Sequence, residues 1–241
     1  EIARPLEMLR EPVLGYLMEL LTGMQPLSAL CNPPKATTSV ASWYFQTGGL
    51  RRRLALLART ADVLSALHGK GLVYSDPSPH NIFVSEASDA TEVRFIDSDN
   101  IHYVSSAGLP TVFTPGYGAP ELIRGASGVN SLTDAHAFAV LTFQTLSLVH
   151  PLIGDAVANG PPEREEEAFA GAMPWVDDPG NSSNRCSIGI PRSVTLSARL
   201  AEISQRAFGA GLAEPLQRPG VSEWAERLHA AADATVLCQE C

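Results

Sequence analysis

The stretch that most constrains the fold runs from a helical apolar repeat, through a turn, into a strand. Between residues 50 and 67 apolar side chains recur at intervals of three and four, the spacing of an amphipathic helix, and glycines follow the repeat. The next segment, residues 72–84, is punctuated by prolines and ends in an apolar run. A second apolar run at 93–96 predicts a β-hairpin with it. These residues therefore predict a long helix followed by a small hairpin.

The rest of the chain mixes both kinds of element. Residues 2–9 and 13–20 predict two antiparallel strands around a turn, and residues 31–49 predict a loop with a short helix. Helical spacing continues over residues 133–148, 163–172, 196–207 and 222–232. We interpret the acidic run at the start of the second of these helices as a solvated face. An α+β fold that is mainly helical follows.

Composition narrows the functions open to these 241 residues. The apolar content of 45% is sufficient for a substantial core, and a net charge of -9 offers no basic field to a phosphate backbone, so no nucleic-acid partner is expected. The most apolar stretch, residues 135–149, contains His136 and Gln144 and is too short and polar for a bilayer, so it predicts a buried helix and no membrane partner. The first residues do not have the pattern of a secretion signal, so we expect a cytoplasmic protein.

Three polar side chains belong to the predicted hairpin. Asp76 and Asn81 lie in the turn before its first strand, and Asp97 ends its second strand. If the hairpin forms, Asn81 and Asp97 lie near each other at its base, with Asp76 beside them. Oxygen ligands grouped this way suit Mg²⁺, and a carboxylate outside the metal shell can orient a hydroxyl. Each residue alone commonly caps a turn, but together they are the working parts of phosphoryl transfer.

Five motifs in a fixed order now resemble one family. The segment "LHGKGLVYSDPSPHN" resembles the LHxxGIxHRDLKPxN catalytic loop of eukaryotic-type (Hanks-type) Ser/Thr protein kinases, and "RFIDSD" stands at the place of their DFG segment. "FTPGYGAPEL" is close to GTPxYxAPE, "LTDAHAFAVL" resembles SDxWSxGV, and "LQRPGVSEW" resembles the closing RPxxxE. The resemblance implies a protein-kinase-like α+β fold, with a mainly helical C-terminal lobe, a catalytic β-hairpin and remnant strands of the N-terminal lobe.

The resemblance also divides the chain. Residues 1–21 would be a remnant of the kinase N-lobe with its last strands and hinge, residues 22–235 the C-lobe, and residues 236–241 the start of a zinc-ribbon tail. The Gly-rich phosphate loop and the strand Lys of the family are not found, because Glu1 already stands where the fourth strand of the small lobe is expected. The small lobe is thus expected to be largely absent from this chain.

Roles follow by similarity for the residues of the catalytic loop. Asp76 would accept or orient the substrate hydroxyl, Asn81 and Asp97 would bind Mg²⁺, and Thr114 would lie beside Asp76, which favours Ser/Thr acceptors. Ser78 replaces the catalytic-loop lysine of the family, and losing such a donor can reduce the rate by about 10² to 10³.

Other similarities concern ATP binding and structure. By similarity, Met18 takes the gatekeeper position, and the backbone of Glu19 and Leu21 would bind the adenine edge. Gln25 would contact the ribose, and Phe83 would form the floor of the adenine pocket. Met18 and Phe83 equally suit plain core packing.

The structural residues implied by the resemblance are fewer. Glu121 would pair with Arg218 and tie the activation segment to the late helices, and Asp134 would cap the backbone of the catalytic loop.

Besides Ser78, two further departures from the family bear on activity. Ser75 replaces the HRD arginine, so control by phosphorylation of the activation loop is not expected. The DFG position reads Asp97, Ser98 and Asp99, and Asp99 either enlarges the metal shell or is an ordinary turn residue. These departures leave a second function open, that of a pseudokinase acting as a nucleotide-binding or scaffold module in a bacterial signalling complex. Phosphorylation of a small molecule is disfavoured by the APE and RPxxxE elements.

The cysteines give a weaker signal. Cys238 and Cys241 form a lone CxxC, which is either a zinc half-site or two incidental thiols, and Cys31 and Cys186 are expected to be buried thiols. With the first strand pair, the CxxC resembles a bacterial kinase-like subgroup. That likeness suggests a metal-dependent phosphatase and a von Willebrand-type protein as partners, beside the Ser/Thr protein substrate.

Overall fold

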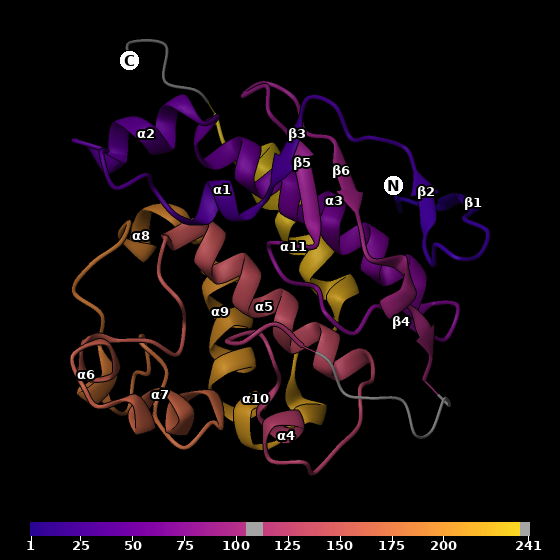
Figure 1. Cartoon of the computed structure of the whole chain (residues 1–241). Helices are drawn as coiled ribbons and strands as arrows, with labels where there is room; N and C mark the ends of the chain where they lie inside the picture. The colour runs from indigo at the N-terminus through magenta and orange to yellow at the C-terminus, as the bar shows by residue number, and fades with distance from the viewer. Residues whose placement is uncertain (105–112, 237–241) are drawn as a thin grey trace.

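The computed structural model describes residues 1–104 and 113–236 and shows mixed helices and small sheets, consistent with a kinase-like α+β fold (Figure 1). The strands are β1 (Pro5–Met8), β2 (Tyr16–Met18), β3 (Met24–Pro26), β4 (Leu72–Val73), β5 (Ile82–Ser85), β6 (Val93–Phe95) and β7 (His102–Tyr103). The helices are α1 (Ser28–Cys31), α2 (Val40–Gln46), α3 (Gly49–His68), α4 (Pro120–Ile123), α5 (Ser131–Ser147), α6 (Asp155–Ala158), α7 (Pro162–Phe169), α8 (Arg192–Thr195), α9 (Ala198–Phe208), α10 (Ala210–Ala213) and α11 (Val221–Ala234).

Helices α3, α5 and α11 form the centre of the molecule (Figure 1). The predicted helix of residues 50–67 is confirmed as α3, and the four later helical predictions match α5, α7, α9 and α11 within a few residues. Helix α5 is buried along nearly its whole length, as the apolar run of residues 135–149 predicts. Asn130 caps its start by accepting hydrogen bonds from the backbone amides of Leu132 and Thr133. This cap fixes the first turn of α5, which carries Asp134.

The predicted hairpin is confirmed, with β5 and β6 antiparallel and Ile82 opposite Phe95. The sheet has a third strand that the sequence did not predict, because β3 pairs with β5 through only three residues and shows no alternation. One sequence prediction is wrong in detail. The strand β6 ends at Phe95, so Asp97 does not end it; instead Asp97 has a left-handed conformation with φ 51° and precedes a single 3₁₀ turn at residues 98–100.

The predicted N-terminal strand pair is confirmed as β1 and β2, which are antiparallel and shorter than the apolar runs. The chain before β1 adds to the edge of the central hairpin, since the amide of Ala3 donates to the carbonyl of Phe95 at 2.8 Å. Several large apolar side chains in and beside the β1–β2 pair are exposed, among them Leu6, Leu14 and Leu20. The sequence between residues 31 and 49 contains α2, the short helix expected there.

Cys31 and Cys186 are buried free thiols, as predicted, whereas Cys238 and Cys241 lie outside the described residues. Burial raises the pKa of the Cys31 thiol to about 11, and its sulfur lies 3.3 Å from the hydroxyl of Thr145. Within residues 1–104 and 113–236, no helix combines the length and the apolar character needed to cross a bilayer.

Candidate active site

The carboxylate of Asp76 is buried and held by three donors. Thr114 donates to it twice, from its amide to Oδ1 at 2.8 Å and from its hydroxyl to Oδ2 at 2.7 Å. The side-chain amide of Asn81 donates to Oδ2 at 2.9 Å and to the backbone carbonyl of Asp76 at 3.1 Å. A carboxylate has about four acceptor sites, so roughly one is left for a further donor. The structure thus fixes Asp76 in an orientation in which it can still accept a hydrogen bond from a hydroxyl.

Asn81 and Asp97 lie at the base of the hairpin. The amide of Ile96, the residue before Asp97, donates to the backbone carbonyl of Asn81 at 3.0 Å. Because the Asn81 nitrogen faces Asp76, its Oδ1 is directed elsewhere, and no donor within the described parts of the chain reaches that oxygen. The Asp97 side chain is exposed overall, but the protein removes some water from around its carboxylate. This desolvation, followed by the charges of Asp99 and Asp76, raises the pKa of Asp97.

This donor set suits a hard divalent cation. It offers an amide oxygen and a carboxylate in a region of negative charge. In the same region, burial and then the charges of Asp97 and Asp76 raise the pKa of Tyr74. Among the residues that the structure describes, no group of three or more His, Cys, Asp or Glu side chains could hold a metal ion. A cation here would therefore take its other ligands from water and phosphate, as Mg²⁺ commonly does.

The loop that carries Asp76 is anchored to α5. Asp134 is fully buried, and its carboxylate accepts from the amides of Tyr74 at 2.8 Å and Ser75 at 2.9 Å. His68 at the end of α3 lies 2.9 Å from the same carboxylate, a partner that the sequence did not reveal. The hydroxyl of Tyr74 donates to the carbonyl of Ile96. The loop is thus fixed from both sides, by α5 and by the segment that leads to Asp97.

Ser75 adds a second link between these segments. Its hydroxyl donates to the carbonyl of Asn100 at 2.8 Å and lies 3.2 Å from Nδ1 of His102. The two-residue strands β4 and β7 pair directly beside it, with Val73 opposite His102. Ser75 therefore connects the loop to the Asp97 segment by hydrogen bonds.

Ser78 lies in the same loop: its amide donates to the carbonyl of Asp76 at 2.8 Å, and its carbonyl accepts from the amide of Asn81 at 3.1 Å. It is fully buried, and its hydroxyl has no hydrogen-bond partner within the described chain. A side chain without solvent exposure cannot contact a bound phosphate in this conformation. In this conformation Ser78 therefore provides neither charge nor an accessible donor.

The residues predicted to bind a nucleotide lie on the sheet and the first hairpin. Gln25 and Phe83 are half-buried on the neighbouring strands β3 and β5, and Met18 is half-buried at the end of β2. Glu19 and Leu21 line a cavity of about 220 Å³, which is below the usual 300 to 1,000 Å³ of ligand pockets. The role of these residues in nucleotide binding stays a prediction.

Glu121 and Arg218 form a buried pair 97 residues apart in sequence. Two nitrogens of Arg218 donate to the two carboxylate oxygens at 2.6 and 2.7 Å, and Arg218 also donates to the carbonyls of Gly211 and Leu132. Glu121 lies in α4, which follows the segment that contains Thr114. The pair therefore ties that segment to α5 and to the turn before α11.

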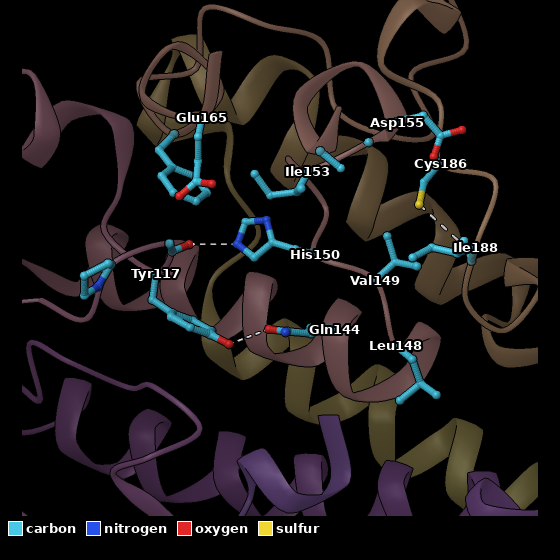
Figure 2. Close-up of a pocket in the computed structure, with 15 residues that line it drawn as sticks. Tyr117, Gln144, Leu148, Val149, His150, Ile153, Asp155, Glu165, Cys186 and Ile188 are labelled. Atoms are coloured by element: carbon cyan, nitrogen blue, oxygen red, sulfur yellow. Dashed lines mark hydrogen bonds between the residues drawn. The ribbon is translucent and has the colours of Figure 1, made fainter. Parts of the chain in front are cut away.

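The turn after Thr114 is held by residues that the sequence did not indicate. Gly116 has φ +86°, a conformation that favours glycine, and its carbonyl accepts from Nε2 of His150 at 2.9 Å. The hydroxyl of Tyr117 donates to the side chain of Gln144 on α5 (Figure 2). Sequence patterns cannot show such contacts, because the groups that they join are 27 and 34 residues apart in the chain.

Two histidines near this turn predict a pH-dependent stability. Burial lowers the pKa of His150 to about 4, and burial with the nearby charge of Arg218 lowers that of His136 well below its usual value. Between pH 6.5 and pH 4 both histidines remain neutral in the folded chain, whereas the unfolded chain takes up protons. The free energy of unfolding should therefore fall as the pH decreases through this range. The expected slope is at most about 1.4 kcal/mol per pH unit for each histidine. Urea midpoints between pH 7 and pH 4.5 measure this slope. His150→Gln should flatten it and the exposed control His80→Gln should not, and a slope equal in all three proteins would contradict the prediction.

Comparison with known proteins finds several Ser/Thr protein kinases that are similar to part of the chain. No family model matches it. It is 34% identical over 116 residues to the Serine/threonine-protein kinase pkn2 of Myxococcus xanthus, covering 45% of this chain and 14% of that protein. It is 33% identical over 138 residues to the Serine/threonine-protein kinase Pkn1 of the same organism, covering 54% and 18%. PknG of Mycobacterium leprae, also a Ser/Thr protein kinase, is 35% identical over 96 residues, covering 39% and 12%.

These relatives support a kinase-like domain. The chain spans less than a fifth of the length of each of the three kinases it matches. Their names support phosphoryl transfer to Ser or Thr in general.

Proposed function

We propose that this protein transfers the terminal phosphoryl group of ATP to Ser or Thr hydroxyls of a protein acceptor and that it requires Mg²⁺. The observation that carries the proposal is the buried carboxylate of Asp76, held by Thr114 and Asn81 beside the exposed carboxylate of Asp97. In the proposal Asp76 would be the oriented base, and Asn81 and Asp97 would be the two metal ligands. The similarity to bacterial Ser/Thr kinases supports the same assignment.

In this proposal Asp76 accepts the hydrogen bond of the acceptor hydroxyl and takes its proton as the oxygen bonds to the terminal phosphorus. The bond from that phosphorus to the bridging oxygen of the nucleoside diphosphate breaks in the same step. Asn81 and Asp97 would hold Mg²⁺, which supplies positive charge to the phosphate oxygens. Thr114 keeps the Asp76 carboxylate in place and lies where the acceptor hydroxyl approaches, because its own hydroxyl already contacts that carboxylate.

A pseudokinase remains the second candidate, and the burial of Ser78 favours it. The site has no cation at the position from which the family neutralises the transferred phosphoryl group. Removing one preorganised donor of this kind typically reduces rates by about 10² to 10³, so slow catalysis agrees with the same observation.

Labelling with radioactive ATP separates the two candidates. The full-length protein is expected to transfer label to itself or to a general acceptor such as casein, on Ser or Thr, and chelation of Mg²⁺ by EDTA should remove the label. A thermal-shift titration with ATP, with and without Mg²⁺, provides the companion measurement. Stabilisation by ATP that needs no Mg²⁺, with no transfer of label, would favour the scaffold function and contradict the enzyme.

A further inference from the structure

A cavity of about 800 Å³ lies at the start of α3. Its walls come from the end of α2, the first turns of α3, the loop between β5 and β6 and the chain directly after α11. The volume is within the range of roughly 300 to 1,000 Å³ that is usual for pockets that bind small molecules. The apolar side chains of the lining are those of Phe45, Leu50, Ala55 and Val236. The cavity therefore offers space for an apolar group beside the start of a long helix.

This cavity lies at the far end of the two elements that carry the candidate active site. Helix α3 begins beside α2 and ends beside β4, and its 20 residues span about 30 Å (Figure 1). The loop of Asp76 follows the end of α3, whereas the cavity adjoins the start of this helix. Asn81 and Asp97 lie at the base of the β5–β6 hairpin, whereas Ser88 and Thr91 of the cavity lie in the loop at its tip. A ligand in the cavity would thus be separate from any ligand at Asp76.

Two arginines line the cavity, and neither forms an ion pair within the described parts of the chain. Arg51 is exposed, whereas Arg52 is buried and donates to three backbone carbonyls, those of Thr47, Ser85 and Ala90. A guanidinium has five N–H donors, so two of those of Arg52 remain. Burial lowers the pKa of Arg52, and the charge of Asp89 opposes this shift. Within the described chain Asp89 is the only acid that lines the cavity, so positive charge prevails there although the whole chain has a net charge of -9.

The start of α3 adds backbone donors to this positive charge. Gly48 precedes the helix and provides no side-chain cap. The first three amides of the helix have no acceptor within the described residues, and they belong to Gly49, Leu50 and Arg51. Gly48 has φ +96°, and a Cβ atom there would lie 2.4 Å from the carbonyl oxygen of Ser88, so only glycine lets the β5–β6 loop approach the helix so closely. Uncapped amides and the helix dipole together favour an anion at this place.

We propose that this cavity binds a phosphate monoester that carries an apolar or aromatic body. The body would pack on Phe45 and Leu50, and the phosphate would bind the two arginines and the amides at the start of α3. A carboxylate has about four acceptor sites, whereas the three terminal oxygens of a phosphate ester accept more hydrogen bonds, which matches the number of unused donors. A free ester and a phosphorylated tyrosine side chain share this chemistry. The inference goes beyond the proposed function and does not depend on it.

Titration of the full-length protein with phenyl phosphate, without ATP or Mg²⁺, tests the site. Ligand-observed NMR at physiological salt should show saturable binding with a dissociation constant of about 1 mM or below. Phenylacetate keeps the ring but has fewer acceptor oxygens, and methyl phosphate keeps the phosphate but lacks the ring, so each should bind at least about fivefold more weakly. Arg51→Gln should weaken phenyl phosphate about three- to fivefold, the scale of an exposed ion pair. Phe45→Ala should weaken phenyl phosphate and leave methyl phosphate unchanged.

The control variant is Arg59→Gln, which is exposed on the same helix but lies outside the cavity lining. It should bind phenyl phosphate as the native protein does. The proposal would be overturned by no saturable binding up to about 10 mM, by equal binding of phenyl phosphate and phenylacetate, or by equal losses in the Arg51 and Arg59 variants.

An alanine peptide with one phosphotyrosine distinguishes the two sources of the ester. Binding about tenfold or more tighter than that of phenyl phosphate would support a phosphorylated side chain as the ligand. Equal or weaker binding of the peptide would support a free ester. Both results retain the site, provided that Arg51→Gln weakens the binding and Arg59→Gln does not.

Discussion

Replacing Asp97 by asparagine is expected to reduce phosphoryl transfer by about three orders of magnitude or more while the fold persists. Asp97 is the only charged residue among the proposed metal ligands, so its loss removes most of the attraction for Mg²⁺. Its side chain is exposed and makes no hydrogen bond within the described chain, and asparagine tolerates the left-handed conformation that the position requires. Rates of label transfer and melting temperatures of the two proteins measure the effect.

The matched control for this experiment is Asp99→Asn. Asp99 lies two residues further on, in the 3₁₀ turn, and is also exposed. As an ordinary turn residue it should leave the rate within a few-fold of native, whereas a large loss would add it to the metal shell. Label transfer that survives in the Asp97 variant would refute the assignment of Asp97, and a collapse of its melting temperature would show a structural role instead.

The sequence predicted elements with a strong period or a long apolar run. The helix of residues 50–67 and the hairpin at 82–96 are of this kind, because a period of 3.6 or a paired apolar run is visible without any tertiary information. Strands of two or three residues, such as β4 and β7, carry no period at all and form only because neighbouring segments place them in register. They could not be predicted from the pattern.

In the candidate site, too, the sequence predicted some features and not others. The order of polar residues along the chain placed Asp76 and Asn81 in one turn, and the structure joins them by hydrogen bonds. The contacts of His68 and His150 were missed because each depends on a backbone or side chain many residues away. The burial of Ser78 could not be predicted from the sequence either, because serine has no strong preference for buried or exposed positions. The roles of these residues in catalysis stay predictions.

Glu121→Gln is expected to lower the free energy of unfolding by about 3 to 5 kcal/mol, because it leaves the buried guanidinium of Arg218 without a counter-charge. Such a loss is a large fraction of the stability of an ordinary domain. Urea denaturation measures it. The control is Arg206→Ala, which breaks an exposed pair with Glu223 and should cost less than about 1 kcal/mol.

A double variant separates the unpaired charge from simple loss of contact. If the cost arises from the buried charge, Glu121→Gln combined with Arg218→Met should recover part of the stability that Glu121→Gln loses. Equal costs for Glu121→Gln and Arg206→Ala would contradict the prediction. Because α4 follows the segment of Thr114, loosening this pair should also release the donors that hold Asp76. Proteolysis near residue 114 should then accelerate in Glu121→Gln and not in Arg206→Ala, which would show that the buried pair stabilises the candidate site as well as the fold.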